Sequence, residues 1–148
     1  MEFIARLFAV KNHKAAVNQI LDRLDLAPRQ NHLAGSLSGG WKQQLALAMC
    51  LVHGPELLLL DEPTAGVDPK ARREFWDIIH ELAQGGITVL VSTHYMDEAE
   101  RCRELIYIAY GKILARGTQS DIIASYDLNV WELSGDAAGR AAGRLVSN

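Results

Sequence analysis

Two groups of residues within residues 37–68 have the types and spacing needed to handle phosphate. Ser38-Gly39-Gly40 precedes a helical run, and both glycines and the positive end of a helix dipole favour the close approach of an anion. Asp61 and Glu62 follow residues 57–60, four leucines typical of a strand that is buried on both faces. Ligands bind at such strand ends in open parallel sheets. The stretch therefore predicts two phosphate-handling sites joined by one buried helix.

A third candidate residue, His94, follows another apolar run. Residues 87–91 are apolar and β-branched, which predicts a second buried strand ending at the same sheet edge as Asp61. A lone histidine more often packs or lies on the surface, but this position favours a functional role. The acidic residues that follow, Asp97, Glu98 and Glu100, are interpreted as helix-favouring surface residues.

The elements that must position these residues are mainly helices. Ser38 is a good N-cap, and the predicted inner face of its helix consists of Leu45, Ala48, Met49 and Val52. Asp68-Pro69 has the pattern of an N-cap followed by a first helical residue. The core stripe of that helix is predicted to be Phe75, Ile78, Ile79 and Leu82, and Gly85-Gly86 is expected to end it.

The two ends of the chain have different patterns. Apolar residues at three- and four-residue steps predict two amphipathic helices within residues 2–26, with a break near Asn12 and an end at Pro28. Residues 105–110 and 113–115 predict a hairpin, and Thr118 with Asp121 approximates a capping box.

These residues resemble the motifs of the ATP-binding cassette (ABC) family of transport ATPases. LSGGW at residues 37–41 resembles the family signature LSGGQ, and residues 57–62 resemble its Walker B strand with the catalytic glutamate. Gly66-Val67-Asp68 is similar to the D-loop and His94 to the switch histidine. The resemblance covers about residues 3–118, and the segments TAGVDP, STHYMDEAE and AYGKILARG point to bacterial drug-exporter ATPases.

The resemblance implies an α/β fold: an incomplete P-loop NTPase with a largely parallel sheet and an N-terminal helical subdomain. It implies ATP and Mg²⁺ as ligands, with Asp61 holding Mg²⁺ through a water and Glu62 polarising the attacking water. His94 would bond the γ-phosphate.

The resemblance also implies partners. Two cassettes would face head to tail, so that Ser38, Gly39 and Gly40 of one hold the ATP bound by the other, with Asp68 at the interface. Trp41 replaces the usual glutamine, a change expected to affect the nucleotide sugar rather than the phosphate. An integral membrane permease would be a further partner.

One family motif is not found in this sequence. No G-x-x-x-x-G-K-[ST] pattern is present, and Gly111-Lys112 is better interpreted as part of a hairpin turn. We therefore expect the C-terminal portion of a nucleotide-binding domain, divided into a partial helical subdomain (1–36), the later part of the nucleotide-binding core (37–126) and the start of an accessory unit (127–148). A strand is predicted at residues 129–133 and a weak helix at 136–146. The chain alone is predicted to have negligible ATPase activity.

Composition narrows the cellular setting. A net charge of −3 with interspersed basic residues provides no basic stripe, so nucleic acid is not expected as a partner. The two cysteines, Cys50 and Cys102, have neither disulfide-framework nor metal-ligand spacing, which fits a reducing compartment. Apolar runs fall short of the ~20 residues that span a bilayer. The expected location is the cytoplasm, peripheral to the inner face of the cell membrane.

Three functions are consistent with these patterns. The leading hypothesis is the ATP-binding and hydrolysing component of a drug or antibiotic exporter. The first alternative is a non-catalytic module that docks on a complete cassette and either lends it Ser38 or blocks its site. The second is a soluble ABC-family ATPase that acts on DNA or ribosomes, although the long coiled coils and basic linkers of such proteins are not seen here.

Overall fold

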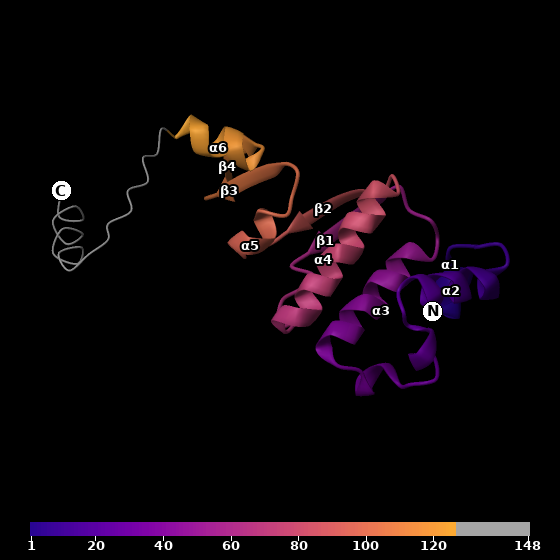
Figure 1. Ribbon diagram of the computed structural model, residues 1–148. Helices are drawn as coiled ribbons and strands as arrows, with labels where there is room; N and C mark the ends of the chain where they lie inside the picture. Colours follow the sequence, from indigo (N-terminus) through magenta and orange to yellow (C-terminus); the bar gives the residue numbers. More distant parts are fainter. Residues whose placement is uncertain (127–148) are drawn as a thin grey trace, which may run out of the picture. The chain divides into compact units, whose positions relative to one another are not determined.

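The computed structural model describes residues 1–126, which Figure 1 shows in colour. The chain divides into two compact units, Met1–Arg101 and Cys102–Asn148. Every candidate site residue lies in the first unit. The predicted domain boundaries after residues 36 and 126 stay predictions, and the strand and helix predicted at 129–133 and 136–146 lie outside the described residues.

The first unit begins with two helices, α1 (Glu2–Leu7) and α2 (His13–Arg23). The predicted break is confirmed, because Asn12 adopts a left-handed backbone conformation with φ 53° immediately before α2. Asparagine tolerates this conformation better than most residues. The predicted end at Pro28 is wrong, since α2 ends at Arg23 and Pro28 lies in the 3-10 turn η1 (Ala27–Arg29).

A second 3-10 turn, η2 (Ala34–Ser36), leads into α3 (Gly39–Leu51). Ser38 is the N-cap as predicted, and its Oγ accepts from the Trp41 backbone N–H at 3.5 Å. The predicted inner face is only partly right. From Leu45 on, α3 is apolar nearly all round and lies between α2 and α4, so its periodicity alone does not identify the buried face. The buried residues here are Leu47, Ala48, Leu51 and Val52, whereas Leu45 and Met49 are half-buried.

The helix α4 (Pro69–Gln84) lies beside α3 (Figure 1). Asp68 caps it as predicted, because Asp68 Oδ1 accepts from two backbone N–H groups, those of Lys70 and Ala71, each at 3.1 Å. Gly85 ends the helix, also as predicted. The buried stripe is Phe75, Trp76, Ile79 and Leu82, with Trp76 in the place expected for Ile78, which is half-buried.

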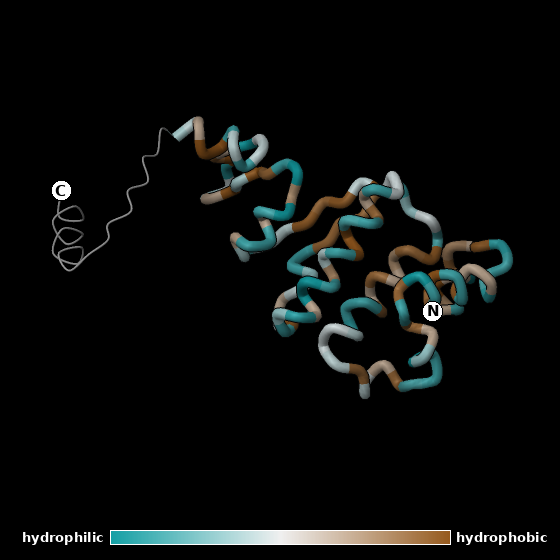
Figure 2. The backbone as a smooth tube through the Cα atoms, viewed as in Figure 1, coloured by the Kyte–Doolittle hydropathy of each residue, from teal (hydrophilic) through white to brown (hydrophobic). Residues whose placement is uncertain are grey.

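The strands β1 (Leu57–Asp61) and β2 (Thr88–Ser92) pair in parallel, with α4 between them in sequence. The prediction that β1 is buried on both faces is wrong for the described residues. Leu58 is 4% exposed, but Leu59 is 68% exposed, because side chains alternate along a strand and only one face of this two-stranded pair is packed. In Figure 2 the segment of these strands is coloured brown, because most of their residues are hydrophobic.

The second unit contains the predicted hairpin and short helix. β3 (Leu105–Ala109) and β4 (Lys112–Gly117) pair antiparallel around Tyr110 and Gly111, both of which have positive φ. The turn therefore lies one residue before the predicted Gly111-Lys112, because Lys112 begins β4. The capping box predicted from Thr118 and Asp121 opens α6 (Gln119–Ser125). Among residues 1–126, no helix is both long and apolar enough to cross a membrane.

Candidate functional site

The carboxyl ends of β1 and β2 bring two side chains into direct contact. Asp61 ends β1 and Ser92 ends β2, and the parallel register places them opposite each other. The Ser92 hydroxyl donates a hydrogen bond to Asp61 Oδ1. Because both side chains are exposed at the strand ends, the carboxylate is oriented but remains accessible to a ligand.

Glu62 begins the turn that leaves β1. Its backbone has φ 42°, in the left-handed region that non-glycine residues seldom occupy. Two bonds hold this conformation, because the Glu62 N–H lies 3.0 Å from the Ser92 carbonyl oxygen and 3.1 Å from Ser92 Oγ. The side chain is half exposed. The end of β2 thus fixes the backbone from which the Glu62 carboxylate projects.

His94 lies against Glu62, a contact that the sequence did not predict beyond placing His94 at the same sheet edge as Asp61. Its Nδ1 is 3.1 Å from Glu62 Oε1, and its ring stacks at a tilt on Tyr95 with centroids 4.2 Å apart. The pair can share a proton, since an imidazole N–H can donate to a carboxylate and a protonated imidazole can form an ion pair with it. Asp61, Glu62 and His94 therefore form one candidate site, named here the strand-end site.

The Ser38-Gly39-Gly40 segment forms the start of α3, and its two glycines have different surroundings. A Cβ on Gly39 would meet only the Gly66 carbonyl oxygen, at 3.9 Å, whereas a Cβ on Gly40 would lie 2.6 Å from Ala71 Cβ. Gly40 is thus needed for the close packing of α3 on α4. Ser38 and Gly39 are exposed and remain candidates for contact with phosphate.

Trp41 has a partner in the first unit. The Arg29 guanidinium lies over the Trp41 ring, 3.7 Å from its centroid. This cation–π contact attaches η1 to the first turn of α3, beside the exposed Ser38 and Gly39.

Two residues near the strand-end site were missed or misread from sequence. Ser92 was not singled out, although counting from the aligned ends of the two parallel strands would have found it opposite Asp61. Glu98 was interpreted as a surface residue, and this is wrong, because it is 1% exposed. No local pattern separates Glu98 from Asp97 and Glu100, which are exposed as predicted.

The donor chemistry of the strand-end site fits a magnesium ion that is held mostly by phosphates and water. Mg²⁺ prefers carboxylate and other oxygen ligands, and with nucleotides it takes one or two carboxylates rather than a protein cage. Asp61 supplies one accessible carboxylate beside the Ser92 hydroxyl. Within residues 1–126, no group of three or more metal-ligating side chains is assembled. The residues present therefore fit the Mg²⁺ of a bound nucleotide.

A separate pocket of about 500 Å³ lies between α4 and α5 (Met96–Ala99). Its walls carry charges of both signs. The positive charges belong to Arg72, Arg73 and Arg101, and the negative charges to Asp97, Glu98 and Glu100. The strand-end site residues are not among those that line it, so the pocket is not the place where the predicted chemistry is assembled.

Sequence comparisons identify similar proteins. Residues 3–65 match a family model described as ABC transporter. The probable multidrug ABC transporter ATP-binding protein YbhF of Escherichia coli (strain K12) is 49% identical over 104 residues, which is 70% of this chain and 18% of the relative. The daunorubicin/doxorubicin resistance ATP-binding protein DrrA of Streptomyces peucetius is 39% identical over 132 residues, 87% of this chain and 40% of the relative. The chain thus spans less than half of either relative.

Solved structures agree with these matches. A nucleotide-free ATP-binding cassette from an ABC transporter aligns with a TM-score of 0.72 at 28% identity, covering 78% of this chain and 46% of the cassette. The dimeric bacterial ABC transporter cassette MJ0796 aligns with a TM-score of 0.62 at 29% identity, covering 70% of this chain and 46% of that one. The predicted α/β fold and the resemblance to drug-exporter ATPases are confirmed.

Proposed function

Since this chain contains part of an ATP-binding domain of the ABC transporter family, we propose that it contributes Asp61, Glu62 and His94 to a site that hydrolyses ATP. The observation that carries the proposal is the strand-end site itself. Asp61 and Glu62, which are adjacent in sequence, and the distant His94 all lie at the carboxyl ends of two parallel strands, with Glu62 Oε1 and His94 Nδ1 3.1 Å apart.

Each residue has a role that its geometry permits. Asp61, oriented by Ser92, would hold Mg²⁺ through a bound water. Glu62 would accept a proton from the water that attacks the γ-phosphate. His94 would donate to that phosphate from Nε2, because its Nδ1 faces Glu62. Bound Mg²⁺ would supply neutralisation of the charge on the β- and γ-phosphates.

The proposed site needs groups from beyond these residues. The 148 residues contain no G-x-x-x-x-G-K-[ST] sequence, so the loop that cradles the β- and γ-phosphates is supplied by another segment or chain. We further propose that Ser38, Gly39 and Gly40, at the start of α3, contact the nucleotide of a second cassette, with Asp68 near that interface. The chain alone should bind ATP weakly and turn over almost none.

We propose a drug or antibiotic exporter as the setting, with a membrane permease as partner and a location at the cytoplasmic face of the membrane. The support is the names of the relatives, which describe multidrug transport and daunorubicin/doxorubicin resistance.

A chimera tests the proposal. The matching segment of the Streptomyces peucetius DrrA is replaced by the corresponding residues of this chain, so that DrrA supplies the rest of its own sequence. We expect ATP hydrolysis by the chimera, and a fall of about 10²–10⁴-fold in turnover on Glu62→Gln, the range for loss of a general base. Binding of ATP should remain within about twofold, since the base acts on water rather than on nucleotide.

Glu100→Gln is the matched control, because Glu100 is an exposed glutamate close in sequence to the site. It should leave turnover unchanged. Full steady-state ATPase activity in the Glu62→Gln chimera would remove Glu62 from the role of base.

A further inference from the structure

Glu98 is a charged residue buried in the first unit. It lies on the short helix α5, and only 1% of its surface is exposed. Burial of a carboxylate is costly unless hydrogen bonds and a nearby positive charge compensate it. The partners of Glu98 therefore indicate what its burial achieves.

The two carboxylate oxygens of Glu98 bind two different turns. Oε1 accepts a hydrogen bond from the Thr64 hydroxyl, and Oε2 accepts one from the Thr93 hydroxyl at 2.6 Å. Thr64 lies two residues after Glu62, and Thr93 lies directly before His94. One carboxylate thus joins the turn that carries Glu62 to the turn that carries His94.

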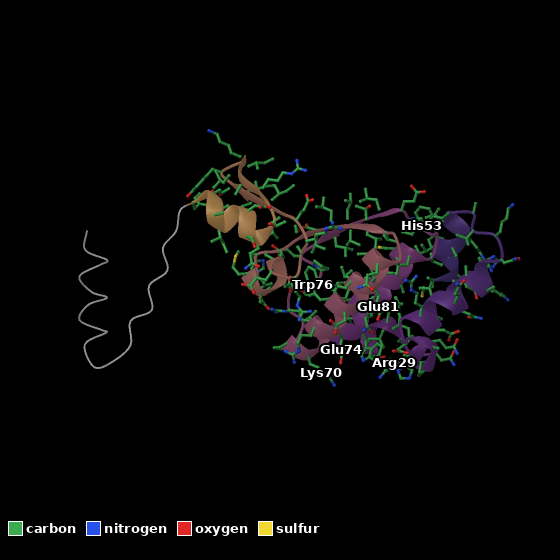
Figure 3. All side chains as sticks on the ribbon, turned by 45° about the horizontal axis from the view of Figure 1, so that its top comes forward. Arg29, His53, Lys70, Glu74, Trp76 and Glu81 are labelled. Atoms are coloured by element: carbon green, nitrogen blue, oxygen red, sulfur yellow. The ribbon has the colours of Figure 1, made fainter. Side chains whose placement is uncertain are left out.

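The same carboxylate is fixed to α4. Arg72 Nε lies 3.5 Å from Glu98 Oε1, and the Arg72 guanidinium also lies over the Tyr95 ring, 4.1 Å from its centroid. Trp76, labelled on α4 in Figure 3, is 2% exposed and lines the same pocket as Arg72 and Glu98. The carboxylate that joins the two turns is therefore also ion-paired with a residue of the long helix α4.

The Thr93 hydroxyl has a second bond that limits substitution of its partner. Thr93 Oγ1 accepts from the Tyr95 backbone N–H at 3.1 Å while it donates to Glu98. A glutamine at position 98 would present its N–H₂ group to one of the two threonine hydroxyls. That hydroxyl could then no longer donate its hydrogen bond to residue 98.

Burial raises the pKa of the Glu98 carboxyl, but the bonds from Thr64 and Thr93 and the charge of Arg72 outweigh burial and hold this pKa below the ordinary value.

We propose that Glu98 is a positioning residue for the strand-end site. By joining Thr64 and Thr93, it sets the separation of Glu62 and His94 without touching nucleotide. The roles of Glu62 and His94 in hydrolysis rest on the proposed function, but their mechanical coupling through Glu98 does not.

The test measures that coupling in the 148-residue chain by NMR of the histidine rings, assigned with His94→Gln. The measured quantity is the change in the His94 ring nitrogen shifts that Glu62→Gln causes. We expect this change to fall at least twofold in the Thr93→Val background. That variant keeps the buried Glu98 carboxylate but removes its hydrogen bond to the turn that carries His94. Thr93→Ser retains the hydroxyl and should retain the full response.

Glu98→Gln is measured in the same way and should also reduce the response, whereas Glu100→Gln should not. The proposal is overturned if either folded variant, Thr93→Val or Glu98→Gln, keeps the full response of His94 to Glu62→Gln. It is also overturned if both variants unfold, because the network would then serve stability alone. The measurement uses no nucleotide, so failure of the proposed ATPase function would leave its outcome unchanged.

Discussion

Gly40 shows how closely two helices approach beside a candidate nucleotide contact. A methyl group at its Cβ position would lie 2.6 Å from Ala71 Cβ, closer than real Cβ atoms are found. The sequence interpretation gave both glycines the same purpose, the close approach of an anion. In the structure, Gly40 is required because α4 packs too closely against it to leave room for a side chain.

Gly40→Ala should therefore destabilise the first unit. Forcing one extra methyl into a packed contact costs about 1–3 kcal/mol, which outweighs the gain of up to about 1 kcal/mol in helix propensity. Urea unfolding of the 148-residue chain followed by circular dichroism measures the loss.

Two variants control this experiment. Gly39→Ala meets its nearest atom at 3.9 Å and should leave stability unchanged or slightly raised. Ala71→Gly removes the opposing methyl and should restore much of the stability lost in Gly40→Ala. An additive double variant would contradict the steric explanation.

At the scale of elements, Asp68 begins α4 through two backbone hydrogen bonds to its Oδ1. Asp68→Ala should lower the free energy of unfolding by about 1 kcal/mol, the usual effect of losing an N-cap. Asp68→Asn keeps the capping oxygen and should remain within a few tenths of a kcal/mol. Thermal unfolding of both variants distinguishes them.

The same pair of variants separates the structural role of Asp68 from its proposed place at a cassette interface. Asparagine preserves the cap but removes the charge. If Asp68→Asn were as unstable as Asp68→Ala, the capping bonds would not explain the start of α4.

The anchoring of α5 should depend on pH through Glu98. Its pKa in the folded chain lies below the ordinary value of 4.5, so the folded state favours the carboxylate. This contribution to stability is fully present above the unfolded pKa and is lost as pH falls through the lower folded pKa.

Glu98→Gln should accordingly be less stable than wild type at pH 7, by about 1–3 kcal/mol for buried partners left unsatisfied. The difference should shrink as the pH falls below about 4.5, where the unfolded chain takes up the proton, and on through the lower pKa of the folded chain, where the native carboxylate is protonated. Urea titrations across this pH range measure it, with Glu100→Gln as the exposed control. A difference that is constant with pH would contradict an ionised Glu98.

Elements were predictable from sequence where their determinants are local. Ser38, Asp68 and Thr118 were each identified as N-caps because a cap is decided within one turn of helix. The faces of α3 and β1 were not, since burial depends on which distant element packs against them. Glu98 was misread for the same reason, as its partners lie 34 and 5 residues away in sequence.

The strand-end site was predicted for a different reason. Parallel strands align their carboxyl ends, so Asp61 and His94 could be placed at one edge without knowledge of side-chain contacts. The contact between His94 and Glu62 and the hydroxyl of Ser92 opposite Asp61 required the register.

At the scale of the whole molecule, the β1–β2 pair has one exposed apolar face. Leu59 and Leu90 are register partners, and they are 68% and 57% exposed, with Leu57 beside them at 53%. Contiguous exposed apolar surface and open strand edges both favour association. We expect the chain to self-associate at micromolar concentrations.

Charge on this face should reduce that association. Leu59→Glu should shift sedimentation towards the monomer, because a carboxylate is costly to bury between two copies. Leu33→Glu is the control, since Leu33 is 81% exposed but lies in the loop before α3. Equal shifts in both variants would indicate an effect of net charge rather than of the sheet face.

The parallel pairing of β1 and β2 also has a consequence for the order in which the chain folds. The β3–β4 hairpin can close across two turn residues, whereas β2 can pair with β1 only after α4 has returned the chain to it. Contacts distant in sequence form more slowly than local ones. The meeting of Glu62 with His94 therefore comes late, and its appearance in a refolding experiment would mark the completion of the first unit.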